Sequence, residues 1–172
     1  MAITPDTKDW TWVLDRPCPE CGFDPDSLTP QDVARRVEAT LPRWDAALIR
    51  EDVRVRPDES TWSALEYACH VRDVFELFRR RLDLILAEDG ARFADWDQDA
   101  TAREKDYAGA DPRTVRSELA EQGALARDAF AGVPDEAFGR RGLRSNGSEF
   151  TVVTLARYFL HDVEHHLHDV KA

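Results

Sequence analysis

Positive charge is scarce in this sequence. Lysine and arginine together number 23 against 34 aspartates and glutamates, which gives a formal net charge of −11 at neutral pH. A protein that follows the phosphate backbone of a nucleic acid needs clustered lysine and arginine side chains. The charge balance therefore argues against nucleic acid as a partner.

Long apolar runs and paired cysteines are missing as well. No stretch approaches the length of about 18 apolar residues that a membrane span needs. Residues 1–12 lack the basic and then apolar regions of a secretory signal. Three cysteines, an odd number, do not match the even disulfide framework of small secreted proteins. We therefore expect a cytoplasmic protein with no membrane partner.

What is present fits one domain with a core of its own. The chain has 172 residues, of which 42% are hydrophobic and 33% are charged. Residues 1–28 carry tryptophans, prolines and a Cys-Pro-Glu-Cys turn without helical periodicity, which predicts an extended N-terminal arm. Residues 29–172 predict an all-α domain, a four-helix bundle.

Four amphipathic stretches predict the helices of this bundle, because their apolar residues recur at spacings of three and four. Their starts are marked, in chain order, by Thr29-Pro30, a Ser63/Glu66 capping box, Asp111-Pro112 and Thr151. The connections between them are long, which indicates a bundle with crossovers and not a series of short hairpins. One connection, residues 91–110, shows little periodicity and is predicted to be irregular.

All five histidines lie on two of the predicted helices. One of them, His70, is near the start of the second helix, and the others lie near the end of the last helix, at positions 161, 165, 166 and 168. If these helices pack antiparallel, the two groups meet at one end of the bundle. Metal sites in bundles are built in this way, from side chains on facing helices.

The helical wheel selects among the residues of the last helix. Two pairs with i, i+4 spacing compete, His161 with His165 and Asp162 with His166. At about 100° per residue, the second pair flanks the apolar stripe and the first pair lies on the far side of the helix. His161, His165 and His168 are therefore expected on the outer face or behind the metal ligands. A metal site of His70, Asp162 and His166 follows, with zinc, nickel or iron(II) as suitable ions. A solvated histidine face is the alternative.

Two segments resemble the DinB-like superfamily, which includes bacterial thiol-dependent S-transferases and mycothiol-dependent maleylpyruvate isomerases. They are WSALEYACH at residues 62–70 and HDVEHHLHDV at residues 161–170. The resemblance spans residues 29–170 and implies a DinB-like four-helix bundle. It implies metal ligands at His70, Asp162 and His166, although Asp162 stands where histidine or glutamate is usual. It also implies a homodimer.

This resemblance predicts a metal-dependent enzyme that uses a low-molecular-weight thiol, an S-transferase or an isomerase. The metal would bind the thiol sulfur and lower its pKa, so that a thiolate meets an electrophilic substrate. Glu66, one turn from His70, and His165 are candidates for orienting a ligand or moving protons. A non-catalytic metal-binding or interaction protein and a metal-assisted hydrolase are the alternatives.

The segment at residues 139–149 is a basic loop in an acidic chain. Arg140 and Arg141, with Arg144 nearby, could bind a carboxylate or an anionic thiol cosubstrate, since arginine binds carboxylates in bidentate fashion. A solvated loop is the alternative. In residues 91–110, Trp96 and the aspartates beside it could form a lid over the metal end, with ordinary packing of Trp96 as the alternative.

The pair Cys18 and Cys21 resembles half of a zinc ribbon, but no second Cys-x-x-Cys is present. The third cysteine, Cys69, lies on a predicted helix beside His70. Three interpretations stay open at this point: a reduced pair that shapes a turn, a zinc site completed by histidines, and a redox dithiol.

Overall fold

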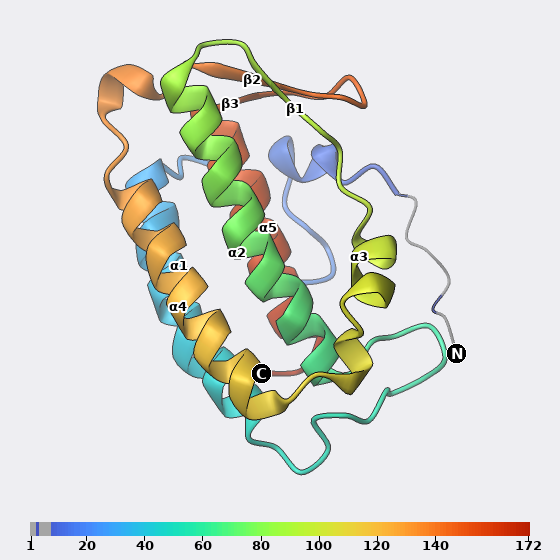
Figure 1. The fold of residues 1–172 in the computed structure, drawn as a ribbon. Helices are drawn as coiled ribbons and strands as arrows, with labels where there is room; N and C mark the ends of the chain where they lie inside the picture. Colours follow the sequence, from blue (N-terminus) through green and yellow to red (C-terminus); the bar gives the residue numbers. More distant parts are fainter. Residues whose placement is uncertain (1–2, 4–7) are drawn as a thin grey trace.

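The computed structural model describes residue 3 and residues 8–172. Its body consists of four long helices, shown in Figure 1: α1 (Pro30–Leu48), α2 (Ala64–Ala87), α4 (Pro112–Ala131) and α5 (Val152–Asp169). Helices α1 and α2 each pack against both α4 and α5. The helices that follow one another in the chain, α1 and α2, therefore lie diagonally opposite in the bundle. The long connections cross the bundle, as the sequence predicted.

The helices begin where their capping residues predicted. Thr29 and Asp32 form a capping box at the start of α1, and Pro30 occupies the first helical position. Ser63 and Glu66 form the equivalent capping box of α2. These side chains satisfy backbone N–H groups that a helix start leaves without partners. Local sequence alone therefore fixes where α1 and α2 begin.

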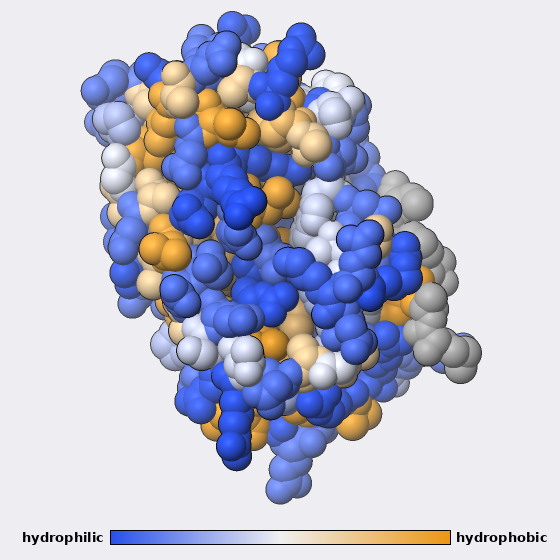
Figure 2. Space-filling model, in the orientation of Figure 1, coloured by the Kyte–Doolittle hydropathy of each residue, from blue (hydrophilic) through white to orange (hydrophobic). Residues whose placement is uncertain are grey.

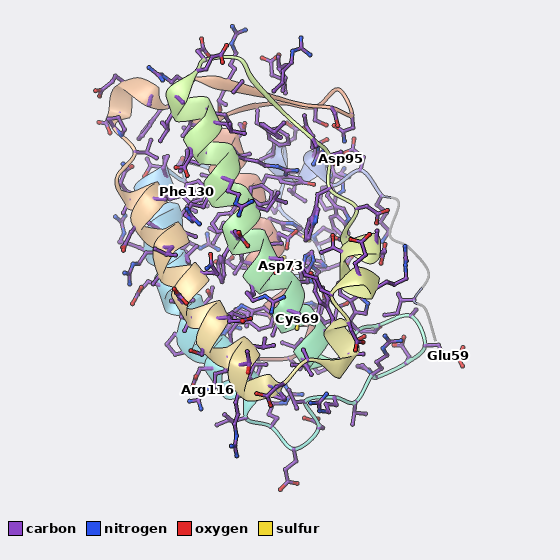
Figure 3. All side chains as sticks on the ribbon, in the orientation of Figure 1. Glu59, Cys69, Asp73, Asp95, Arg116 and Phe130 are labelled. Carbon is purple, nitrogen blue, oxygen red and sulfur yellow. The ribbon has the colours of Figure 1, made fainter. Side chains whose placement is uncertain are left out.

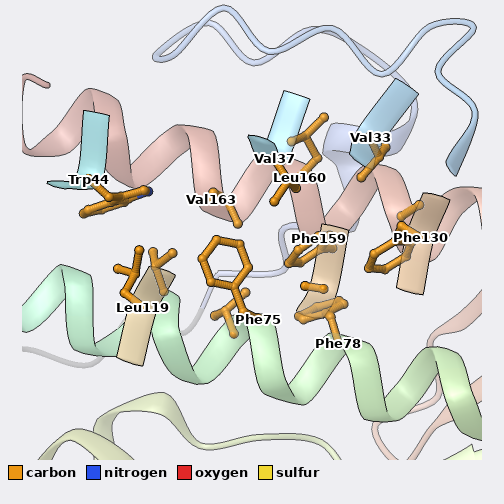
Figure 4. Close-up of a cluster of buried hydrophobic side chains, with 14 of the residues drawn as sticks. Val33, Val37, Trp44, Phe75, Phe78, Leu119, Phe130, Phe159, Leu160 and Val163 are labelled. Atoms are coloured by element: carbon orange, nitrogen blue, oxygen red, sulfur yellow. The ribbon is translucent and has the colours of Figure 1, made fainter. Parts of the chain in front are cut away.

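The core lies where the apolar faces of the four helices meet (Figure 4). Phe159 of α5 stacks on Phe130 of α4 with ring centroids 4.9 Å apart, and it meets Phe75 of α2 edge-on at 5.9 Å. Trp44 of α1 is fully buried toward the other end of the same core (Figure 4). Burial of such large aromatic surfaces supplies much of the favourable free energy of folding.

The all-α prediction is only roughly right, because a small sheet covers one end of the bundle (Figure 1). Strand β1 (Ala91–Phe93) pairs in parallel with β2 (Arg141–Arg144), and β2 pairs antiparallel with β3 (Glu149–Thr151). The predicted basic loop is thus a hairpin, whose turn contains Gly147 at a φ of +95°. Strands of three or four residues are too short to show an alternating pattern in the sequence.

The sheet lies against the C-terminal end of α2, and Gly142 in β2 permits the close approach. A Cβ atom at this position would lie 2.5 Å from Cδ1 of Ile85 and 2.7 Å from Cε1 of Phe93. Only glycine fits between these two side chains without displacement.

The predicted irregular segment also contains more structure than expected. It includes β1, a short helix α3 (Gln98–Glu104) that Asp97 caps, and a 3-10 turn at Tyr107–Gly109. Helix α3 buries none of its residues, so its sequence carries no amphipathic signature. Tyr107 anchors the segment to α2 through a hydrogen bond to Asp73, which Figure 3 labels on that helix.

The N-terminal arm is packed onto the bundle from residue 8 onward. A 3-10 turn, η1 (Thr11–Leu14), contacts α5, and Val13, Cys18 and Phe23 are buried. The face of the molecule seen in Figure 2 is mainly hydrophilic, with scattered apolar patches. In the part of the chain that the structure describes, no helix is long and apolar enough to cross a membrane.

Candidate metal centre

The antiparallel packing of α2 and α5 brings together the three residues that the sequence selected. Nε2 of His70 lies 3.0 Å from Oδ1 of Asp162, and Nε2 of His166 lies 3.6 Å from the same oxygen. One ligand atom from each residue lies within 4.8 Å of the others. The start of α2 and the end of α5 thus form a three-donor cluster at one end of the bundle.

The spacing of these donors suits a small divalent metal. Two ligand atoms at about 2.0–2.1 Å from a tetrahedral zinc ion lie about 3.3 Å apart, and the two observed separations lie on either side of that value. Two imidazoles and one carboxylate leave at least one coordination position for a small molecule. Aspartate stands at position 162 where the family usually has histidine or glutamate. Its shorter side chain still lies within 3.6 Å of both imidazoles.

A second carboxylate orients one of the candidate ligands. Nδ1 of His166, on the opposite side of the ring from Asp162, lies 2.8 Å from Oδ2 of Asp169. A carboxylate in this position fixes the tautomer and the ring plane of a metal-binding histidine. The ring of Tyr67 packs on His166 at 4.7 Å. The residues around His166 therefore hold it in one orientation.

Two tryptophans cover His70, which is fully buried. The indole of Trp96 stacks on the His70 ring with centroids 5.3 Å apart and planes 17° from parallel, and Trp62 lies at 5.6 Å. Trp96, within the segment of residues 91–110, therefore covers one side of the cluster, and its indole ring keeps water away from that side. A lid formed by the whole segment stays a prediction, since β1 of the same segment lies at the other end of α2.

Charged neighbours keep the two carboxylates at the cluster anionic. Burial alone would raise the pKa of Asp162, but the charge of His70 and its hydrogen bond outweigh that effect and hold the pKa well below its ordinary value. The pKa of Asp169 is also lowered against burial, chiefly by its hydrogen bond to His166. Both carboxylates are therefore anionic at neutral pH.

A cleft of about 1100 Å³ opens beside the cluster. Asp162, His166 and Trp96 line it, and so do two arginines, Arg81 and Arg144. Arg81 is buried, and its guanidinium lies over the ring of Phe93. Burial, with the nearby charge of Arg144, lowers the pKa of Arg81 to about 10, so its guanidinium remains cationic at neutral pH.

The structure does not bring Arg140 and Arg141 to this cleft. Arg140 donates a hydrogen bond to the carbonyl oxygen of Leu86, and Arg141 lies beside Asp89, at the far end of α2. Sixteen residues of helix, about 24 Å, separate Leu86 from His70. The role of Arg140 and Arg141 in cofactor binding therefore stays a prediction. Of the three arginines, only Arg144 lines the cleft.

The carboxylate of Glu66 caps the start of α2. Its carboxylate accepts hydrogen bonds from the backbone N–H and the hydroxyl of Ser63, and it pairs with the guanidinium of Arg56. Burial would raise the pKa of Glu66, but Arg56 and Ser63 outweigh it and lower the pKa. A catalytic role for Glu66 stays a prediction, and these contacts favour a structural one.

His161 and His165 lie on a covered face of α5, so the expectation that this face is exposed to solvent was wrong for them. They are only 4% and 7% exposed, because the N-terminal arm covers this face of α5. Burial, with the charge of His165 adding to it, lowers the pKa of His161 to about 4, and burial also lowers that of His165. His165 faces the arm, and its predicted acid–base role at the trio stays a prediction.

The one sequence signal for the burial of His161 and His165 under the arm was the Cys-x-x-Cys motif. A helical wheel considers the residues of α5 alone, so it cannot show that residues 8–28 cover this helix. His168 differs from its neighbours, since its side chain is 54% exposed.

Comparison with known proteins agrees with the fold. The family model described as the DinB superfamily matches residues 35–170. No curated protein matches the chain. A solved structure, YfiT from Bacillus subtilis, superposes with a TM-score of 0.74 at 18% identity and covers 85% of this chain and 87% of its own. That protein is described as a probable metal-dependent hydrolase with an unusual four-helix bundle topology. The matched region includes α2, α4, α5 and most of α1, well over half of the chain, and the chain therefore belongs to the DinB superfamily.

Proposed function

We propose that this protein is a metal-dependent enzyme that joins a low-molecular-weight thiol to a small anionic electrophile. The observation that carries the proposal is the convergence of His70, Asp162 and His166 beside a large cleft. When bound, a divalent metal there lowers the pKa of a coordinated thiol or water and so supplies a nucleophile at neutral pH. The remaining steps depend on the residues of the chain.

These residues hold the cluster and exclude water from part of it. Asp169 fixes the ring of His166, while Trp62 and Trp96 enclose His70. Tyr67 lines the cleft, and burial raises the pKa of its phenol, which therefore stays protonated as a hydrogen-bond donor. Such fixed groups reduce the reorganisation that the reaction requires.

The anionic character of the substrate follows from Arg81 and Arg144. Each guanidinium packs on aromatic rings, Arg81 over Phe93 at 4.8 Å and Arg144 over Phe150 at 5.3 Å. Nε of Arg81 is buried, and it has no hydrogen-bond partner among the described residues. Arg144 also lies 3.6 Å from a carboxylate oxygen of Asp95, so Arg81 is the cation that suits a carboxylate or a similar group on the substrate.

The volume of the cleft favours two reactants. About 1100 Å³ exceeds the range of about 300–1,000 Å³ that is common for a single small molecule. In the transfer, the thiol sulfur bonds to the electrophilic carbon, the leaving group departs with its bonding pair, and the thiol proton passes to solvent. Hydrolysis by water at the same site is the second candidate, because the structurally similar YfiT is described as a probable metal-dependent hydrolase.

Metal content in purified variants tests the site. We expect His70→Ala and His166→Ala to lose the same equivalent of metal, and His168→Ala, at the exposed position of the same helix, to retain it. Unchanged metal content in both site variants would show that the trio is not a metal site.

Substrate assays then separate the functions. Consumption of a thiol with a panel of anionic electrophiles, lost in His70→Ala, supports transfer. Hydrolysis of anionic esters or amides without thiol supports the second candidate, and bound metal with neither activity would leave a non-catalytic metal-binding protein.

A further inference from the structure

A second group of candidate metal-binding side chains lies on an adjacent face of α5. Cys18 and Cys21 come from the N-terminal arm, and His161 and His165 come from successive turns of α5. One ligand atom from each of the four lies within 4.8 Å of the others. Sγ of Cys18 is 3.8 Å from Nδ1 of His165. Four donors from two distant parts of the chain thus converge on one point.

The backbone of the arm holds the two thiols together. The Cys18 N–H donates to the carbonyl oxygen of Phe23 at 2.8 Å, and the Gly22 N–H donates to that of Cys18 at 2.9 Å. Gly22 has a φ of +74°, a conformation that glycine adopts without strain. This tight loop turns both cysteine side chains toward α5.

Aromatic rings of the arm pack against the two histidines of this cluster. Phe23 meets His161 edge-on at 5.3 Å, and Trp10 lies 5.6 Å from His161 and 5.2 Å from His165. On the same side of the bundle, Nε of Arg157 donates to the carbonyl oxygen of Leu28 at 2.9 Å. The cluster is therefore a packed part of the structure and not a group of mobile surface side chains.

One donor in this cluster lacks any other partner. Nε2 of His161 is buried, and within the described ranges it forms no hydrogen bond, while the side chain is only 4% exposed. A buried polar atom without a partner costs about 1–3 kcal/mol. Coordination to a metal would remove this cost, whereas a reduced cysteine pair that only shapes a turn would not.

The composition and spacing of the four residues specify the ion. The pattern is Cys-x2-Cys with His-x3-His, which lies within the spacings of structural zinc sites. Zinc bonds of about 2.3 Å to sulfur and about 2.0–2.1 Å to nitrogen place these atoms about 3.6 Å apart in a tetrahedron, close to the observed 3.8 Å. Two thiolates and two neutral imidazoles also balance the charge of Zn²⁺, so the filled site can be buried.

We propose that Cys18, Cys21, His161 and His165 bind a zinc ion as a closed, structural site that ties the N-terminal arm to α5. Binding releases the two thiol protons to solvent. Four protein ligands leave no position for a substrate, unlike the open trio. Because His161 and His165 immediately precede Asp162 and His166, this zinc also fixes the rotation of α5 and so positions the ligands of the trio.

Cobalt substitution tests the site without reference to activity. The reduced apoprotein, titrated with Co²⁺, should develop the thiolate-to-cobalt charge-transfer absorption and the intense visible bands of a tetrahedral site. The thiolate bands should disappear in Cys21→Ser and remain in Cys69→Ser, a matched control for a buried cysteine on α2. They should also remain in His70→Ala, which separates this site from the trio.

Zinc content and protease sensitivity provide the second measurement. We expect the zinc of the wild-type protein to fall by one equivalent in Cys21→Ser, and cleavage within residues 8–28 to become faster while the helical circular dichroism persists. Absence of the thiolate band in the reduced wild-type protein would overturn the proposal. A Cys18–Cys21 disulfide in protein purified under reducing conditions would overturn it as well.

Discussion

Nδ1 of His166 lies 2.8 Å from Oδ2 of Asp169, on the opposite side of the ring from the nitrogen that faces Asp162. A carboxylate behind a metal-binding imidazole raises its basicity and fixes its orientation. Asp169 is thus a positioning residue for the trio, one turn of helix beyond the ligand that it orients.

Asp169→Asn should weaken metal binding at the trio by about 10–100-fold while the protein stays folded. Competition with a chromophoric chelator measures the affinity, and the metal lost should be the one that His70→Ala also loses. Asp128→Asn, an exposed acid on α4, is the control and should bind metal as the wild type does. Wild-type affinity in Asp169→Asn would contradict a positioning role.

The buried carboxylate of Asp73 should make the free energy of unfolding depend on pH under acidic conditions. Burial would raise its pKa, but Tyr107 at 2.5 Å and Lys105 at 2.9 Å, with Arg72, hold the pKa below the ordinary value. A depressed folded-state pKa stabilises the fold above about pH 4 and loses that contribution as the pH falls through the folded value.

Asp73→Asn should therefore lower the free energy of unfolding by about 1–3 kcal/mol at neutral pH. It should also flatten the dependence of stability on pH below about pH 4. Urea unfolding at a series of pH values measures both effects. Asp83→Asn, at an exposed position of the same helix, should change stability by less than about 0.5 kcal/mol. A variant as stable as the wild type would show that these contacts contribute nothing net.

Glu66→Gln separates a structural role from a catalytic one. Glutamine can still complete the capping box, but the ion pair with Arg56 is lost, so we expect a lower melting temperature and unchanged turnover per folded molecule. Loss of an acid–base group would lower turnover by about 10²–10⁴-fold. Thermal unfolding and activity, measured on the same sample, distinguish the structural role of Glu66 from the catalytic one. Ser63→Ala, which weakens the cap but keeps the Glu66 carboxylate, is the comparison variant.

Gly142→Ala should destabilise the small sheet. Its Cβ would meet Ile85 and Phe93, and overpacking of this kind costs about 1–3 kcal/mol. Gly139→Ala, a few residues earlier, meets no atom within 4 Å and serves as the control. Chemical denaturation compares the two variants, and equal stability would mean that the sheet shifts freely away from α2.

Much of the fold could be predicted from the sequence, because the signals involved are local. Thr29 and Ser63 mark helix starts through hydrogen bonds to residues three positions away. The metal trio was also predicted, since helical phase and the family register both select Asp162 and His166. The helices, their crossovers and this candidate site therefore needed no tertiary information.

Contacts between distant segments decided the rest. Strand β1 pairs with β2 about fifty residues later, and such short strands leave no periodic signal. The hairpin decides that Arg144 lines the cleft and that Arg140 does not. No property of either residue's immediate sequence distinguishes them.

His161 and His165 show most clearly which properties the sequence determined and which only the tertiary structure decided. The sequence determined that they share a face of the last helix and that two cysteines lie in the arm. Only the tertiary structure decided that residues 8–28 cover that face, which turned an apparently exposed pair into a buried one beside Cys18 and Cys21. Helical periodicity reports which side chains share a face. Which segment covers that face depends on contacts between distant residues, such as Cys18 and His165, which are 147 positions apart.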